Sequence, residues 1–245
     1  LERGLDRHRD TVLRALRDLD HDPHRLSLGA FTRGRRLLDA KERGLLDSAV
    51  KRAASRVTDN VERLTRHRDT AIRGRAYSVL AKLGAPRLDK RLAAGLSDSL
   101  WRVRVQVMHA IVLARRQGTI DLRTASALLR RRLRAEYWRE REEAVRSLGR
   151  IQARAATRAL ERAVGDRNGF VRQAALWSLG EVGARSAHAA LARGYRDDVA
   201  QVRAAACRTA SRVGLARDPR HRPTLERLLR DPERLVRRAA RAALR

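Results

Sequence analysis

The stretch DRNGFVRQAALWSLGEVG, residues 166–183, contains the pattern that decides the fold. It holds an apolar residue followed by arginine, Val171-Arg172, and further apolar residues four, eight and eleven positions after the valine. These spacings place the apolar side chains on one face of an α-helix. The stretch ends at Gly183, and glycine is the typical residue just beyond the end of a helix. The stretch therefore predicts one amphipathic helix with a defined end.

The same pattern recurs along the chain at intervals of 31, 37, 31, 31 and 34 residues. A shorter helical segment precedes each copy from residue 87 onward, and no stretch alternates apolar and polar residues as a strand would. Repetition at this period is typical of solenoids built from helix pairs, so the sequence predicts an all-α chain. The copies start at Ile72-Arg73, Val103-Arg104, Glu140-Arg141, Val171-Arg172, Val202-Arg203 and Val236-Arg237.

Four copies also carry an aspartate six residues before their arginine. These pairs are Asp98 and Arg104, Asp166 and Arg172, Asp197 and Arg203, and Asp231 and Arg237. With these residues the chain resembles HEAT repeats, specifically the short type that is also found in phycobilin lyases. The resemblance covers about residues 69–245 and implies a right-handed α-solenoid of about six HEAT-type helix-pair repeats. It also implies that the eight residues form a structural ladder between adjacent repeats, and that the patterned helix lines the concave side.

Two parts of the chain depart from this pattern. His67 and Ala135 occupy the aspartate position of their copies, so Arg73 and Arg141 are expected to lack a ladder partner. Residues 1–66 do not fit the repeat, and we expect a divergent helical N-terminal cap that covers the end of the repeat solenoid, residues 67–245. A separate binding or dimerising helical unit is the alternative interpretation of this segment.

The charge of the chain points to an anionic partner. Lys and Arg number 57 against 28 Asp and Glu, which gives a formal net charge of +29. Only four of the basic residues are lysine, and the planar guanidinium of arginine contacts two phosphate oxygens at once. Nucleic acid is the usual polyanion, and an acidic protein or an anionic membrane surface are the alternatives. Only 3% of residues are aromatic, which favours contacts to the phosphate backbone over base-specific recognition.

The candidate binding residues fall into three groups. One group lies two, six or ten positions after the start of each copy, because steps of four trace one stripe along a helix. A denser cluster lies in the 37-residue interval, where arginines end one helix and begin the next. Two tryptophans, Trp101 and Trp138, come two residues before neighbouring copies. The residues predicted to bind nucleic acid are Lys82, Arg130, Arg131, Arg132, Arg134, Trp138, Arg139, Arg146, Arg150, Trp177, Arg208, Arg212 and Arg238.

Signatures of catalysis are missing from the sequence. No glycine-rich phosphate loop or HExxH motif occurs, and a single cysteine excludes disulfide frameworks and cysteine-based zinc modules. Cys207 falls in a mostly apolar column of the repeat, so we expect it to be buried. The sequence therefore predicts no catalytic residue, no metal and no cofactor. Packing of helix ends, base stacking and the chemistry of HEAT-like alkylpurine DNA glycosylases are three interpretations of the tryptophans.

The leading hypothesis is a non-enzymatic basic scaffold that binds nucleic acid by phosphate-backbone contacts. The alternatives are a protein-interaction adaptor that docks an acidic partner on the concave face, a HEAT-like alkylpurine DNA glycosylase, and a phycobilin lyase. The uncharged stretch Val105–Ala114 has half the length of a membrane span, and no signal-peptide pattern is present. We therefore expect no membrane span and a cytoplasmic protein.

Overall fold

The computed structural model describes residues 55–245. The chain divides into two compact units, Leu1–Arg63 and Leu64–Arg245, and the helix pairs described below all lie in the second unit. Residues 55–64 are helical. The predicted cap, residues 1–66, lies mainly outside the described residues and stays a prediction.

Long and short helices alternate along the second unit. The long helices are α4 (Thr70–Leu83), α6 (Trp101–Arg116), α8 (Trp138–Arg150), α10 (Gly169–Glu181), α12 (Ala200–Arg212) and α14 (Arg234–Ala243). The short helices are α5 (Leu88–Gly95), α7 (Leu122–Arg132), α9 (Thr157–Ala163), α11 (His188–Gly194) and α13 (Arg222–Leu228). A 3-10 turn, η1 (Arg154–Ala156), precedes α9. Residues 55–245 contain no strand, and the predicted all-α fold is confirmed.

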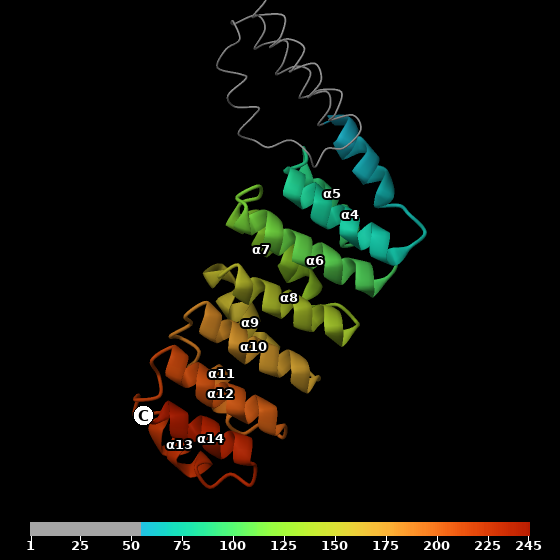
Figure 1. Cartoon of the computed structure of the whole chain (residues 1–245). Helices are drawn as coiled ribbons and strands as arrows, with labels where there is room; N and C mark the ends of the chain where they lie inside the picture. Colours follow the sequence, from blue (N-terminus) through green and yellow to red (C-terminus); the bar gives the residue numbers. More distant parts are fainter. Residues whose placement is uncertain (1–54) are drawn as a thin grey trace, which may run out of the picture. The chain divides into compact units, whose positions relative to one another are not determined.

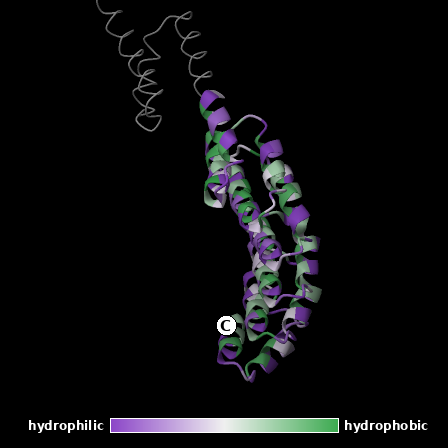
Figure 2. Ribbon diagram, turned by 90° about the vertical axis from the view of Figure 1, so that its right-hand side faces the viewer, coloured by the Kyte–Doolittle hydropathy of each residue, from purple (hydrophilic) through white to green (hydrophobic). Residues whose placement is uncertain are grey.

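The helices of this unit form two layers. Each long helix packs against the next long helix, from α4 to α14, as the stacked ribbons of Figure 1 show. Each short helix packs against the long helix that follows it and stands in the second layer, which Figure 2 shows from the side. The unit is therefore a solenoid of helix pairs. None of the helices within residues 55–245 is long and apolar enough to span a membrane.

The repeated apolar positions form the core between the layers. The valines that start four copies, Val103, Val171, Val202 and Val236, are at most 1% exposed. Residues four positions later are buried in all six copies. Exceptions lie on α4, the first long helix of this unit, where Ile72 and Leu83 are 36% and 49% exposed.

The predicted glycine stops are confirmed at every position. Gly84, Gly118, Gly183 and Gly214 all have a positive φ, between 59° and 77°, which is the conformation that glycine adopts without strain. After α8 the same turn is made by Gln152 with a φ of 52°. This repeat therefore keeps the left-handed turn with glutamine, although glycine adopts that conformation with less strain.

Candidate functional site

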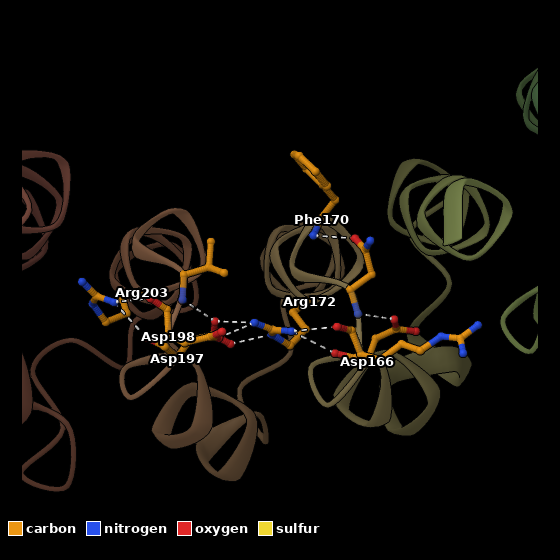
Figure 3. A network of polar contacts seen from close by, with 9 residues as sticks. Asp166, Phe170, Arg172, Asp197, Asp198 and Arg203 are labelled. Carbon is orange, nitrogen blue, oxygen red and sulfur yellow. Dashed lines mark hydrogen bonds and ion pairs between the residues drawn. The ribbon is translucent and has the colours of Figure 1, made fainter. Parts of the chain in front are cut away.

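Arg172 shows how neighbouring repeats are joined (Figure 3). Its Nε and Nη2 each donate to the carboxylate of Asp197 at 2.7 Å, and its Nη1 donates to the main-chain oxygen of Asp166 at 3.1 Å. Asp197 also accepts a hydrogen bond from the main-chain nitrogen of Val199, which shapes the turn before α12. Burial opposes ionisation of Asp197, but the hydrogen bonds from Arg172 and the main chain outweigh it and lower the pKa of the carboxyl.

Where a ladder arginine has a carboxylate partner, that partner belongs to the following repeat. The expectation that Arg73 and Arg141 lack a partner is therefore wrong. The aspartate of an arginine's own repeat supplies only a main-chain oxygen, which Ala135 provides equally well to Arg141 at 2.9 Å. Arg237 donates to two main-chain oxygens and has no carboxylate partner within residues 55–245. The ladder pairs are Arg73–Asp98, Arg141–Asp166, Arg172–Asp197 and Arg203–Asp231.

Glu140 replaces the carboxylate that the ladder lacks at Ala135. Arg104 donates to both oxygens of Glu140, at 2.9 and 2.5 Å, and Arg132 donates to the same carboxylate. Glu140 is only 1% exposed and stands where four other copies have a buried valine. Burial opposes its ionisation, but the hydrogen bonds from Arg104 and Arg132 lower the pKa of Glu140. The two departures of this repeat from the pattern, at positions 135 and 140, therefore compensate each other.

Ion pairs neutralise much of the predicted stripe on the long helices. Three of its six basic residues are paired, as Arg146–Glu142 at 2.9 Å, Arg150–Glu143 at 2.7 Å and Arg212–Glu181 at 2.7 Å. Glu143 also lies 3.2 Å from His109. The other three, Lys82, Arg208 and Arg238, are exposed and make no ion pair within the described part of the chain. The stripe therefore does not form a continuous row of free cations.

Free guanidinium groups gather instead between the short helices α7 and α9. A cleft of about 730 Å³ is lined there by Arg130, Arg131 and Arg134, at and after the end of α7, and by Arg162 of α9. We call these four residues the arginine cleft. All four side chains are exposed, and none has a hydrogen bond or ion pair to another residue of the described chain. Asp166 also lines the cleft, but its carboxylate is held by Arg141.

Four aromatic side chains form a row across the first turns of α6, α8 and α10. Successive ring centroids are 4.7 Å apart from Trp101 to Tyr137, 6.2 Å to Trp138 and 5.3 Å to Phe170. We call these four residues the aromatic row. The guanidinium of Arg139 lies over both tryptophans, 5.5 Å from the ring centre of Trp101 and 5.3 Å from that of Trp138.

Sequence reasoning found only half of the aromatic row. It singled out Trp101 and Trp138 but not Tyr137 and Phe170, which stand three and one residues before the start of their copies. A comparison of the residues one, two and three positions before the start of each copy would have found them. The exposed Trp177 of α10 is not part of the row, and the ring of Phe170 points away from the ladder (Figure 3).

The described residues offer little for catalysis. No three His, Cys, Asp or Glu side chains within residues 55–245 are placed to hold a metal ion. Cys207 is fully buried, as predicted, and burial raises the pKa of its thiol to about 12. Its sulfur is therefore protonated at neutral pH and out of reach of solvent.

The sequence matches the family described as HEAT repeats over residues 125–211 and 171–245. A search of curated proteins finds no match. Solved structures with the same fold include the archaeal HEAT-like repeats protein from Thermococcus onnurineus NA1, which is 14% identical with a TM-score of 0.53. That match covers 80% of this chain and 90% of the archaeal one.

Two further solved structures are similar. The complex of CpcE and CpcF of phycocyanin lyase from Nostoc sp. PCC7120 is 20% identical, with a TM-score of 0.51, and the match covers 76% of this chain and 75% of that chain. A designed armadillo repeat protein is 15% identical, with a TM-score of 0.52 and coverage of 76% and 97%. At these identities the likeness concerns the fold alone. Residues 125–245 belong to the HEAT-repeat family, and the described residues from 70 to 243 form an all-α solenoid of HEAT-type helix pairs.

Proposed function

We propose that this HEAT-repeat chain is a non-enzymatic scaffold that binds nucleic acid through the phosphate backbone. The binding surface is centred on the arginine cleft rather than on the stripe of the long helices. The observation that carries the proposal is the concentration in one cleft of four guanidinium groups that have no partner among residues 55–245. Free guanidinium groups bind phosphate strongly, because each one offers two parallel N–H donors to two oxygens.

The distribution of the acidic residues supports this location. The acidic residues within the bounds of the long helices are each paired with an arginine; they are Glu140, Glu142, Glu143 and Glu181. The short helix α7 carries Arg123 and Arg130 to Arg132 without any acidic residue within its bounds. Contacts of this kind neutralise phosphates without reading bases, so we expect binding that depends on salt and varies little with sequence.

A charge-matched pair of variants tests the proposal. The first changes Arg130, Arg131, Arg134 and Arg162 to alanine, and the control changes Arg116, Arg185, Arg196 and Arg217, which are also exposed and without an ion pair within the described chain. Both variants lose four positive charges. Affinity for a labelled duplex of about 20 base pairs is measured by fluorescence anisotropy at several salt concentrations. Log affinity should fall with log salt at about −0.9 per phosphate neutralised, and each lost contact should reduce that slope by about one.

The comparison between the two variants decides the outcome. We expect the first variant to lose most of the salt slope and the control to keep most of it. Equal losses in both would show that the net charge acts diffusely and that the arginine cleft is not the site. Thermal unfolding of both variants is measured in parallel, because Arg130 and Arg131 also stabilise the carboxyl end of α7.

The alternative function is a protein-interaction adaptor, and the stripe of the long helices favours it. Paired charges there surround Trp177, which is 47% exposed, and mixed charge around an exposed aromatic residue suits a protein partner better than a phosphate backbone. The similar CpcE and CpcF chains form a complex with each other. A protein that co-purifies with the full chain after nuclease treatment, and is lost from Trp177→Ala, would support this alternative.

The glycosylase hypothesis gains no support from the geometry. Of the four acidic residues near the tryptophans, Glu140, Glu142 and Glu143 are each hydrogen-bonded to at least one arginine, and Glu136 is exposed. Such pairing stabilises the ionised carboxylate and reduces its strength as a base.

A further inference from the structure

The aromatic row is not required by the HEAT fold. The positions of Trp101 and Trp138 are occupied in the other four copies by Thr70, Gly169, Ala200 and Arg234. The repeats without an aromatic residue there fold in the same way. Aromatic side chains are rare in this chain, at 3% of residues, and four of the eight lie in this row. Their concentration at one edge of three adjacent repeats therefore indicates a function other than packing.

The aromatic row is accessible from solvent. Phe170 is 57% exposed, and the other three rings are partly exposed. A cavity of about 940 Å³ opens beside the row and is lined by Trp101, Tyr137 and Trp138. The exposed ring of Phe170 and the cavity beside the other three rings therefore leave space for a planar ligand at this edge.

The charges around this cavity favour an anionic ligand with planar groups. Arg102 and Arg139 lie over the tryptophan rings, and Arg167 lines the cavity. Two acidic residues also line it: Glu140, whose charge is offset by Arg104 and Arg132, and the exposed Glu136. A cationic ligand such as a methylated lysine would meet three guanidinium groups and the single carboxylate of Glu136 here. A strand of nucleotides has both features that the site matches, because each base is flat and each linkage carries a negative charge.

The aromatic row lies next to the arginine cleft. Asp166 lines the cleft, Arg141 lines the cavity beside the row, and the two side chains are bonded to each other at 2.7 Å. The cleft and the cavity also adjoin at the end of α7, where Arg131 and Arg134 line the cleft and Arg132 lines the cavity. One ladder pair therefore separates a surface for phosphates from a surface for bases.

We propose that the aromatic row is a base-stacking platform, and that the chain takes single-stranded nucleic acid in preference to duplex. The inference rests on the proposed function, because the arginine cleft supplies the phosphate contacts. Duplex bases are stacked on each other and hide their faces, whereas the bases of a single strand are free to stack on protein rings. Stacking tolerates any base, so this preference requires no sequence specificity.

Three probes of equal length separate stacking from charge. They are an oligothymidine of about 20 nucleotides, an abasic deoxyribose-phosphate strand, and a duplex. We expect the full chain to bind oligothymidine about tenfold more tightly than the abasic strand, within the range reported for stacking on one aromatic side chain. Phe170→Ala should remove most of this difference and leave the affinity for the abasic strand unchanged. Phe170 is the most exposed ring of the row, so its removal disturbs the fold least.

The three tryptophans provide a second, independent measurement. Trp177→Phe leaves only Trp101 and Trp138 as emitters, and the double variant Trp101→Phe with Trp138→Phe leaves only Trp177. We expect oligothymidine to quench the emission of the first protein strongly and that of the second little, and the abasic strand to quench neither.

Failure of this inference is distinguishable from failure of the proposed function. Equal affinity for oligothymidine and the abasic strand, or quenching confined to Trp177, would overturn the stacking platform and leave phosphate binding intact. Absence of binding to all three probes would overturn both. Tight binding of every probe that is insensitive to the arginine-cleft substitutions would overturn the site of the proposed function, and the Phe170→Ala comparison would still decide the stacking.

Discussion

Glu140 shows, at the scale of one residue, how a repeat replaces a missing contact. An unpaired buried charge is costly, so an apolar column normally excludes glutamate. Here the cost is offset because Arg104 and Arg132 both donate to its carboxylate. Glu140 therefore takes the place of the aspartate that position 135 lacks as the carboxylate partner of Arg104. This dependence can be tested by substituting positions 135 and 140 separately and together.

We predict that Glu140→Val destabilises the chain although valine is the residue that four other copies use. The change leaves the guanidinium of Arg104, which is only 17% exposed, without its carboxylate, and costs about 2–4 kcal/mol. Adding Ala135→Asp restores an aspartate at the ladder position, so the double variant should recover more than half of the loss. Urea unfolding of the wild type, both single variants and the double variant gives the coupling energy.

The size of that coupling decides between two explanations. A value above about 1.5 kcal/mol supports compensation between the two positions. Strictly additive effects would mean that Glu140 acts through packing alone. Glu140→Gln serves as the control, because it keeps the volume and hydrogen-bonding reach of the side chain but removes the charge.

At the scale of the element, the sequence predicted the helices and their ends better than it predicted the contacts between repeats. Helix faces and glycine stops depend on residues within one turn of each other, so the apolar period and Gly183 were sufficient to place α10. The partner of a ladder arginine stands 25 or more residues away in the neighbouring repeat, and spacing alone does not say which neighbour. The same limit applied to the stripe, where only the fold shows that Arg212 of α12 meets Glu181 of α10.

The turn after α8 provides the second stability prediction. Gln152 has a φ of 52°, a conformation that costs a residue with a side chain about 1–2 kcal/mol and costs glycine little. Gln152→Gly should therefore raise the free energy of unfolding by about 0.5–1 kcal/mol, since the flexibility of glycine in the unfolded chain offsets part of the gain. Thermal or urea unfolding measures the change.

Gly183→Ala is the matched substitution in the opposite direction. An added Cβ would meet no atom within 4 Å at this position, so only the φ of 67° opposes it. We expect a loss of about 1 kcal/mol. A loss of stability in Gln152→Gly would show instead that the glutamine side chain contributes a contact that outweighs the strain.

At the scale of the whole molecule, five of the 28 acidic residues form the ladder and its replacement, and these five join neighbouring repeats. With 28 acidic residues against 57 basic ones, each carboxylate that pairs inside the solenoid leaves more positive charge on the surface. The same pairs that hold the repeats together therefore also determine where the chain presents free arginine. Protonation of these carboxylates should weaken the contacts between repeats and, at the same time, raise the net positive charge.

Acidification is predicted to unfold the solenoid below about pH 4. Burial opposes ionisation of Asp166, Asp197, Asp231 and Glu140, but their arginine partners lower the pKa of each below that of the unfolded chain. The unfolded chain then binds more protons in this range, so the stabilisation is complete above the unfolded values near pH 4 and is lost as pH falls through the folded ones. Each proton also adds to a net charge that is already +29, and this repulsion favours expansion further.

Circular dichroism between pH 7 and pH 2 follows this transition, with added salt as the second variable. Salt screens the repulsion between surface charges but acts less on the partly buried pairs of the ladder. We therefore expect salt to raise the midpoint temperature at pH 7, and at pH 3 to recover only the part of the loss that repulsion causes. Glu140→Gln should lose less stability on acidification than the wild type, because it lacks one of the groups that titrate. An unfolding temperature that is the same at pH 7 and pH 3 would mean that the ladder contributes no net stability.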